Sequence, residues 1–349
     1  MEEIFENLEE IIEKDELCKL IDNRIKKINL YWGTAPTGVP SIGYFEPLRI
    51  LVLLFKTGYF KITILLADLH AYLDSMKSTL DVIEYRVKVY EIIIKKMLNI
   101  LGLSFEEISE INFIIGSNFQ LTKEYQMDLF KIGLITSIKD AQRAGSEVVK
   151  QNENPSLTSL QYVLMQALDE KYLDAECQLG GHDQRRIMMF SRETLPKLGH
   201  HKCIQLMNKL IPGISFESLH GKPLKMSSSD KTTKISVLDS YSDLKKKINK
   251  TYCKEGDILD NTLLSLLKEL FFPIFRLKKE KFIINRPEKY GGPMSYENFE
   301  TIENDFKSGV LYPTDLKLGI YEFLWSLIEP IIAEFGTEKE LLKKAYPDI

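Results

Sequence analysis

The sequence predicts an α/β protein with a doubly wound parallel sheet in its first domain and a smaller, helical C-terminal domain. In the first two thirds of the chain, short apolar runs alternate with longer amphipathic segments, which is typical of βαβ units. Past about residue 235 the strand-like runs stop, and helical periodicity continues between Pro and Gly breaks. We therefore expect two domains, residues 1–234 and residues 235–349.

The order of elements follows from the same patterns. An amphipathic helix is expected over residues 4–28. Strands are then expected at residues 28–33, 61–68, 112–116, 174–180 and 203–207. Helices between them are expected at residues 41–56, 80–101, 157–172 and 183–195. In the second domain, helices are expected at residues 240–252, 259–277, 296–308 and 314–345.

Composition narrows the class of protein. The chain has 349 residues, with 46 Lys and Arg against 50 Asp and Glu, so its formal net charge is −4. The longest aliphatic run, residues 50–55, is far shorter than the roughly 18 residues that span a bilayer. The acidic N-terminus does not resemble a signal peptide, and we expect a soluble cytoplasmic protein without a membrane partner. The four cysteines lack C-x-x-C spacing, so no disulfide framework or protein-bound metal is predicted.

The segment after the first predicted parallel strand is a candidate phosphate site. It reads Pro36-Thr37-Gly38-Val39-Pro40-Ser41-Ile42-Gly43-Tyr44. A strand, a Gly-containing turn and a helix N-terminus together direct backbone N–H groups and the helix dipole at an anion. Gly43 would let a flat ring lie against the backbone. By itself, the segment is also compatible with an ordinary βα turn.

A second candidate segment ends the first domain and reads Lys225-Met226-Ser227-Ser228-Ser229-Asp230. The ammonium of Lys225 is suited to charge that develops on a transferring phosphate group, and a loop of small hydroxyls can close over such a site. By itself, the hexapeptide could equally be a solvated linker between domains.

Together the two segments resemble the HIGH and KMSKS signatures of the class I aminoacyl-tRNA synthetases. Further stretches, at residues 31–38, 67–74, 166–169, 180–186 and 286–292, look like tyrosyl-tRNA synthetases of the eukaryotic and archaeal type. The similarity runs in order over nearly the whole chain, and the sequence is identified as a member of this family.

The resemblance implies an activity and partners. A tyrosine–tRNA ligase activates L-tyrosine with ATP to tyrosyl-adenylate and pyrophosphate, and then transfers the tyrosyl group to the 3′ end of tRNA(Tyr). The resemblance also implies a Rossmann-type catalytic domain, an all-helical C-terminal domain that reads the anticodon, and a homodimer. The substrate carboxylate is the nucleophile, so positioning and charge stabilisation must provide most of the rate. Mg²⁺ is expected to arrive with ATP, held largely by its phosphates.

The resemblance assigns the tyrosine pocket residue by residue. Tyr31 and Asp169 match the pair that holds the phenolic hydroxyl, and Tyr162, Gln166 and Gln184 match the residues around the α-ammonium. Positions 162, 166 and 169 are i, i+4 and i+7, so they share one face of a helix. His70 either lines this pocket or is a packing residue at a helix start.

The remaining assignments concern ATP and tRNA. Catalytic roles are expected for Lys225, Ser227, Ser228 and Gly43. ATP contacts are expected for Gly33, Thr34, Pro36, Ser41, Gly43, Tyr44, Gly181, Asp183, Lys225, Met226, Ser227, Ser228 and Ser229. Asp315 matches the position associated with the first anticodon base, and Arg143 and Lys150 are weaker candidates for contact with the acceptor end.

One position departs from the family pattern and leaves alternatives open. The first residue of the HIGH equivalent is Ser41 instead of His, and a hydroxyl cannot carry positive charge. We expect ATP use to be somewhat weakened but retained. Ser41 is the sole support for a catalytically silent tRNA-binding paralogue. A tryptophanyl-tRNA synthetase is disfavoured, because indole would leave Asp169 unpaired. The apolar stretch at residues 129–138 fits a dimer interface or a core helix.

Overall fold

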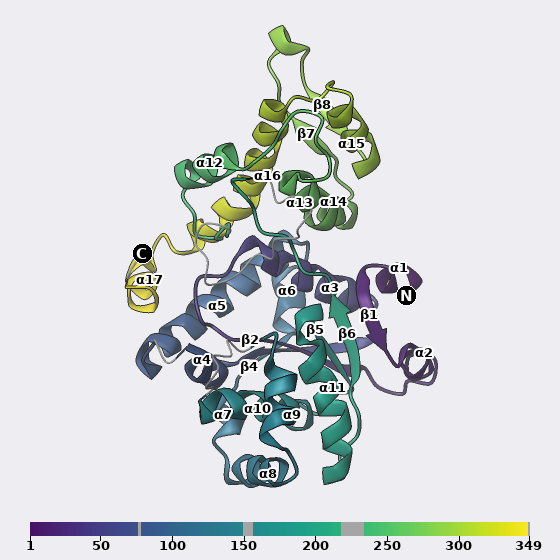
Figure 1. Ribbon diagram of the computed structural model, residues 1–349, viewed down its shortest axis with the longest axis vertical. Coiled ribbons are helices and arrows are strands. Elements are labelled where there is room, and N and C mark those ends of the chain that lie inside the picture. Colours follow the sequence, from purple (N-terminus) through teal and green to yellow (C-terminus); the bar gives the residue numbers. More distant parts are fainter. Residues whose placement is uncertain (76–77, 149–155, 218–233, 348–349) are drawn as a thin grey trace.

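The computed structural model describes residues 1–75, 78–148, 156–217 and 234–347, and its first part is built on a six-stranded sheet (Figure 1). The strand order is β1-β6-β5-β2-β3-β4. β2 to β6 are parallel, whereas β1 pairs antiparallel with β6 at the edge. The parallel strands lie where the sequence predicts them. The strands are β1 (Leu8–Ile12), β2 (Ile28–Thr34), β3 (Phe60–Leu66), β4 (Asn112–Ile115), β5 (Cys177–Gly181) and β6 (Ile204–Asn208).

Helices cover both faces of this sheet. In Figure 1, α3 and α5 lie on the side toward the C-terminal end of the chain, and α7 to α11 lie on the other side. The predicted helix over residues 41–56 begins with a 3₁₀ turn, η1 (Ile42–Tyr44). The helices are α3 (Phe45–Lys56), α4 (Asp68–Ser75), α5 (Leu80–Ile100), α6 (Phe105–Ser109), α7 (Ser117–Gln120), α8 (Lys123–Leu134), α9 (Ile138–Gly145), α10 (Leu157–Tyr172) and α11 (Arg185–Thr194), with the 3₁₀ turns η2 (His182–Gln184) and η3 (Leu195–Leu198).

The N-terminal prediction was wrong. Instead of one helix over residues 4–28, the chain forms α1 (Glu2–Phe5), the strand β1 and α2 (Lys14–Asp22). Glu13 adopts a left-handed conformation with φ of 66°, which ends any helical path between β1 and α2. Over so short a stretch, the mixture of apolar and acidic residues fits both the helical period of about 3.6 residues and the strand period of two. The segment forms a strand because it pairs with β6.

The C-terminal part, defined here as residues 234–347, is mostly helical but not all-helical. Two short antiparallel strands, β7 (Phe282–Ile284) and β8 (Met294–Tyr296), interrupt it, and they are too short to give a periodic signal. The predicted helix over residues 314–345 is two helices. The helices are α12 (Tyr241–Lys250), α13 (Thr262–Leu266), α14 (Phe272–Lys278), α15 (Phe299–Lys307), α16 (Pro313–Glu334) and α17 (Lys339–Ala345), with a π-helical turn, η4 (Leu267–Phe271), and a 3₁₀ turn, η5 (Glu288–Tyr290).

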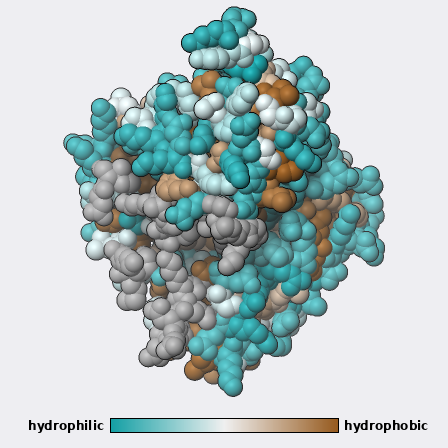
Figure 2. Space-filling view, turned by 45° about the horizontal axis from the view of Figure 1, so that its top comes forward, coloured by the Kyte–Doolittle hydropathy of each residue, from teal (hydrophilic) through white to brown (hydrophobic). Residues whose placement is uncertain are grey.

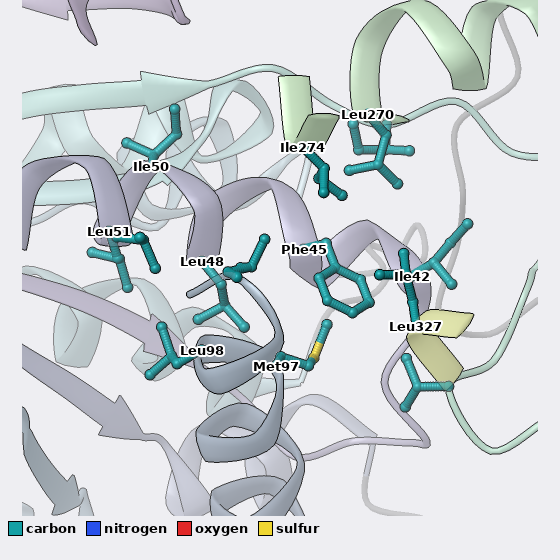
Figure 3. Close-up of a cluster of buried hydrophobic side chains, with 14 of the residues drawn as sticks. Ile42, Phe45, Leu48, Ile50, Leu51, Met97, Leu98, Leu270, Ile274 and Leu327 are labelled. Atoms are coloured by element: carbon teal, nitrogen blue, oxygen red, sulfur yellow. The ribbon is translucent and has the colours of Figure 1, made fainter. Parts of the chain in front are cut away.

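The two parts of the chain share one hydrophobic core. Figure 3 shows Phe45 of α3 and Met97 of α5 beside Leu270, Ile274 and Leu327 of the C-terminal part, and all five side chains are buried. Burial of a Leu, Ile, Phe or Met side chain stabilises a fold by about 1.5–3 kcal/mol. This contact therefore fixes the C-terminal part against the sheet. The boundary between residues 234 and 235 stays a prediction.

The face drawn in Figure 2 is mostly hydrophilic, with hydrophobic side chains gathered in smaller patches, one of them at its lower end. Among the described residues, no helix is both long and apolar enough to cross a lipid bilayer.

Candidate active site

A cavity of about 310 Å³ opens at the carboxyl ends of β2 and β5. These strands are neighbours in the sheet, and the chain order reverses between them, because β3 and β4 continue on one side and β5 and β6 on the other. Open α/β sheets bind ligands at such switch points. The walls come from β2, η1, α4, α10, β5 and the segment after β6.

All six predicted tyrosine-binding residues line this cavity: Tyr31, His70, Tyr162, Gln166, Asp169 and Gln184. The three α10 residues do face the cavity together, as their i, i+4, i+7 spacing predicts. Gln166 donates from Nε2 to Oε1 of Gln184 at 3.1 Å. The ring of Tyr162 stands edge-on to His70, with ring centroids 4.7 Å apart.

Asp169 is buried at the bottom of the cavity, and one of its carboxylate oxygens is fully engaged. Its side chain is only 1% exposed. Tyr125 from α8 and Gln120 from α7 both donate to Oδ1, each at 2.8 Å. The other oxygen, Oδ2, lies 3.6 Å from Nε2 of His70. These two donors fix the rotation of the carboxylate so that Oδ2 faces His70.

Gln120 also determines the protonation of His70. Its amide nitrogen lies 3.4 Å from Nδ1 of His70, and the same nitrogen donates to Asp169. An amide oxygen in this place would face the acceptor Oδ1, so the nitrogen must occupy it. Nδ1 of His70 then accepts, and the proton of the neutral ring sits on Nε2. Burial lowers the pKa of His70 to about 4, which keeps the ring neutral at physiological pH.

Burial lowers the pKa of His70 but raises the pKa of Asp169. It raises the pKa of Asp169 to about 7, although the hydrogen bonds from Gln120 and Tyr125 stabilise the ionised form. Burial also raises the pKa of Tyr31 well above its ordinary value, so this phenol stays protonated and can donate. The site therefore combines a carboxylate that titrates near neutrality with two neutral donors.

Several polar atoms around the cavity have no hydrogen-bond partner among the described residues. They are the hydroxyl of Tyr31, Nε2 of His70, Oε1 of Gln178 and Oδ1 of Asn208, and all four residues line the cavity. A buried polar group without a partner costs about 1–3 kcal/mol. A polar ligand that pairs with them would recover this free energy. Tyr31 and Gln178 are side by side, because they are register partners in the β2–β5 pair.

Another part of the same cavity, next to η1 and the end of β5, contains most of the predicted ATP-binding residues that the structure describes. Gly33, Thr34, Ser41, Gly43, Tyr44, Gly181 and Asp183 line the cavity. Pro36 is buried and does not line it. Oγ1 of Thr34 and the hydroxyl of Tyr44 are hydrogen-bonded at 2.8 Å. Oγ of Ser41 accepts from the Gly43 backbone N–H at 3.3 Å, so Ser41 is the cap of η1.

Two glycines bring the backbone close to this region. A Cβ on Gly181 would lie 2.5 Å from Oδ1 of Asp183, and one on Gly180 would lie 2.4 Å from Cε of Met188. A side chain at either position would force Asp183 or Met188 to move. Lys225, Met226, Ser227, Ser228, Ser229 and Lys150 lie outside the described residues.

Several residues of the site were not predicted from the sequence. Within the described ranges, Lys209 is the one lysine or arginine that lines the cavity, and its Nζ pairs with Oε2 of Glu269 at 3.2 Å. Its position directly after the last parallel strand is a signal that sequence reasoning could have used. Gln120 and Tyr125 carried no such signal, because they belong to no recognised motif and reach Asp169 only through the fold.

The two predicted tRNA-binding residues that the structure describes, Asp315 and Arg143, do not line the cavity. Asp315 is in the first turn of α16, where Oδ2 lies 3.5 Å from Nη1 of Arg286. The 286–292 stretch and the Asp315 position are thus brought together. Arg143 is on α9, its side chain is 72% exposed, and it pairs with Asp140 at 3.0 Å.

Comparisons with known proteins agree with this geometry. Residues 23–328 match the family model described as tRNA synthetases class I (W and Y). The chain is 43% identical over 351 aligned positions to the cytoplasmic tyrosine–tRNA ligase of Saccharomyces cerevisiae, covering 99% of this chain and 86% of that protein. It is 41% identical to the cytoplasmic tyrosine–tRNA ligase of Xenopus laevis, covering 99% of this chain but only 62% of that longer protein.

Among solved structures, the tyrosyl-tRNA synthetase of Archaeoglobus fulgidus, complexed with L-tyrosine, superposes with a TM-score of 0.81 at 34% identity. The match covers 95% of this chain and 98% of that one. A buried polar pocket at the switch point of the sheet, a matching family model and relatives that align over nearly the whole chain lead to one assignment. The chain belongs to the class I tRNA synthetases, in the tyrosyl-tRNA synthetase family of the eukaryotic and archaeal type.

Proposed function

We propose that this protein is a tyrosine–tRNA ligase that activates L-tyrosine with ATP and transfers the tyrosyl group to the 3′ end of tRNA(Tyr). One observation carries the proposal. Asp169, His70 and Tyr31 converge at the buried end of the cavity, and two of them present polar atoms that lack a partner among the described residues. This constellation suits a substrate that carries a hydroxyl at the end of an apolar ring.

The phenolic hydroxyl of the substrate would use both of its hydrogen-bonding capacities. It donates to Oδ2 of Asp169 and accepts from the Tyr31 hydroxyl or from Nε2–H of His70. Phenylalanine has no such hydroxyl and would leave the same protein groups buried and unpaired. The site therefore selects tyrosine by the cost of the unpaired groups. Indole likewise has no hydroxyl at this point, which disfavours tryptophan.

The other end of the amino acid would lie near the hydrogen-bonded pair Gln166 and Gln184, with Tyr162 beside them, which suits an α-ammonium. The substrate carboxylate then faces the N-terminal end of the η1–α3 helical segment, where Gly43 and Ser41 line the cavity. One carboxylate oxygen attacks the α-phosphorus of ATP, the bond from that phosphorus to the α–β bridging oxygen breaks, and pyrophosphate leaves with that electron pair.

Catalysis of this step would come from position and charge. We assign stabilisation of the developing phosphate charge to Lys225, with Ser227 and Ser228 as hydroxyl donors and Gly43 as the close backbone contact. Met226 and Ser229 complete the predicted ATP-binding loop. Lys209 is a further cation at the cavity, within the described part of the chain.

Mg²⁺ would enter with ATP. Among the described residues, no three His, Cys, Asp or Glu side chains are grouped so that they could hold a metal ion. The described residues of the site therefore do not provide a set of ligands that could bind Mg²⁺ without the triphosphate. We propose that the ion stays on the triphosphate, neutralises part of its charge and keeps most of its water ligands.

We further propose a cytoplasmic homodimer that binds tRNA through the C-terminal part. The curated relatives are named as cytoplasmic enzymes.

The proposed dimer surface lies on α8, the loop after it and the first residue of α9, and is here called the α8 patch. It carries large exposed apolar side chains, which mark protein interfaces when they are contiguous. Its members are Met127, Phe130, Leu134, Ile135 and Ile138. Asp315, Arg143 and Lys150 remain proposed tRNA contacts.

The test is ATP–pyrophosphate exchange in the absence of tRNA, with tyrosine, phenylalanine and tryptophan as separate substrates. The proposal expects exchange with tyrosine alone. Exchange with tryptophan instead would make the protein a tryptophan enzyme. No exchange from a folded protein that binds tRNA would make it a catalytically silent paralogue and would overturn the proposal.

A further inference from the structure

Three successive backbone carbonyls in the β2–η1 loop (residues 35–41) are bonded to side chains from outside the loop. Arg86 donates from Nη1 to the carbonyl of Thr37 at 2.8 Å. The carbonyl of Gly38 accepts from the hydroxyl of Tyr90 at 2.5 Å and from that of Tyr346 at 3.3 Å. Nζ of Lys234 donates to the carbonyl of Val39. Such a set of contacts fixes the orientation of consecutive peptide planes.

Apart from Lys234, these donors come from two distant regions of the sequence. Arg86 and Tyr90 are one helical turn apart on α5, and Tyr346 directly follows α17 at the end of the C-terminal part. Figure 1 shows α17 beside α5, far from α13 to α15 of the same part of the chain. Tyr346 is only 5% exposed. Burial raises its pKa far above the ordinary value, so its hydroxyl remains a donor.

Arg86 joins these regions through a single guanidinium group. Besides the Thr37 contact, it donates from Nε to the carbonyl of Ala345, the last residue of α17, at 2.9 Å. Nη1 also donates to Oγ of Ser78 at 2.8 Å, and the guanidinium carbon lies 5.4 Å from the ring centroid of Tyr346. The rigid fork of donors in arginine makes such a junction possible, whereas a lysine could not make all these contacts.

The loop leads directly to the proposed ATP site. It ends at Ser41, which lines the cavity and caps Gly43. Tyr90 reaches the same region by a second route, because its ring stands edge-on to that of Tyr44, with centroids 6.0 Å apart. Gly38 has no side chain and therefore restricts its own backbone conformation little. The hydrogen bonds that its carbonyl accepts from Tyr90 and Tyr346 hold the loop backbone at this point.

We propose that Arg86 is a positioning residue for the β2–η1 loop and that Arg86 and Tyr346 together couple α17 to the ATP site. The inference rests on the proposed function, since it assigns ATP to the region beside η1. It deepens that function by giving the C-terminal end of the chain a part in nucleotide binding. The tyrosine pocket, which is built from β2, α4, α10, β5 and η2, has no contact with Arg86 or Tyr346 among the described interactions.

The test uses the full chain with Arg86→Gln, Tyr346→Phe and the double variant in tyrosine-dependent ATP–pyrophosphate exchange. We expect the KM for ATP to rise on the order of tenfold for Arg86→Gln and less for Tyr346→Phe, because a charged donor contributes more than a neutral one. The KM for tyrosine should stay unchanged. The double variant should lose less than the product of the two single effects, because both residues hold the same loop.

Arg24→Gln is the matched control. Arg24 also donates to a backbone carbonyl, that of Ile21, and lies over a tyrosine ring, that of Tyr59 at 3.7 Å, but it has no contact with the β2–η1 loop. It should leave both KM values as in the wild type. If Arg86→Gln does not fold, Tyr346→Phe, which removes one hydroxyl, still decides the question.

Three outcomes would overturn the coupling. They are an unchanged KM for ATP in both single variants, an equal rise in the KM for ATP and for tyrosine, and a fall in kcat alone, which a merely structural role would produce. Absence of exchange in the wild-type chain would overturn the proposed function itself, so the two failures are distinguishable.

Discussion

Gln120 holds Asp169 and His70 with one amide nitrogen, which lies 2.8 Å from Oδ1 of the acid and 3.4 Å from Nδ1 of the imidazole. Its amide oxygen fits against Gly116, where a Cβ would come within 2.6 Å of it. Gln120 thereby sets the tautomer of the histidine and, together with Tyr125, the rotation of the carboxylate. In the proposed function, the specificity for a phenolic hydroxyl thus depends in part on Gln120, a residue that does not line the cavity.

Gln120→Glu should disable this arrangement, because a carboxylate cannot donate and would repel the ionised Asp169. We expect kcat/KM for tyrosine to fall by about tenfold or more, with the KM for ATP unchanged. Gly116→Ala should act in the same direction by displacing the amide, since the φ of Gly116, −58°, is accessible to alanine. Exchange kinetics with each substrate varied in turn would measure both. An unchanged kcat/KM for tyrosine in both variants would contradict this role of Gln120.

The pH dependence of tyrosine use should follow Asp169 and its buried neighbour Glu170, whose pKa burial also raises to about 7. The raised pKa of Asp169, about 7, means that this carboxylate is ionised above that pH and becomes neutral as the pH falls below it. Because the ionised form accepts the phenolic hydroxyl, kcat/KM for tyrosine should decline toward one decade per pH unit below about 7. His70, with its pKa lowered to about 4, should add no inflection between pH 5 and 8. A flat profile over that range would show that the charge of Asp169 is not needed.

Ser41 stands where the family signature has a histidine, and its hydroxyl caps the Gly43 N–H. Ser41→Ala should raise the KM for ATP a few-fold, since loss of a cap costs about 0.5–2 kcal/mol. The measurement is exchange at varied ATP with saturating tyrosine. Ser41→His tests the departure from the signature. A gain in kcat/KM for ATP is expected if serine weakens ATP use, and no gain would mean that this position is already compensated.

The α8 patch should mediate dimerisation. Phe130 is 62% exposed and Leu134 is 86% exposed on the chain alone, at the end of the molecule away from the C-terminal part (Figure 1). The double variant Phe130→Asp, Leu134→Asp should halve the mass measured by sedimentation velocity, because charges in an apolar interface lose their hydration. Phe105→Asp is the matched control, since Phe105 is 72% exposed on α6, outside the patch. A monomeric wild type, or a dimeric double variant, would contradict the assignment.

Much of the fold could be predicted from the sequence. The parallel strands are continuous apolar runs. Because they alternate with helices along the chain, the sequence predicts a doubly wound sheet. β1 could not be predicted, because it is an edge strand whose identity depends on pairing with β6, a distant partner. The β7–β8 hairpin was missed because each strand has only three residues.

The candidate site divides in the same way. Residues with a motif, such as Tyr31 and Asp169, were predicted and line the cavity. Gln120, Tyr125 and Arg86 were not predicted, because they act through other groups and are brought to them by tertiary packing. The Ser-rich segment with Lys225 lies outside the described residues, and its role stays a prediction.

The role of Asp169, Tyr31 and His70 in the choice of amino acid can be measured by titration calorimetry of the wild-type chain with L-tyrosine and L-phenylalanine, without ATP or tRNA. We expect tyrosine to bind and phenylalanine to bind at least about a hundredfold more weakly, because each unpaired buried group costs about 1–3 kcal/mol. Equal affinities for the two amino acids would contradict the assignment of Asp169, Tyr31 and His70 to the phenolic hydroxyl.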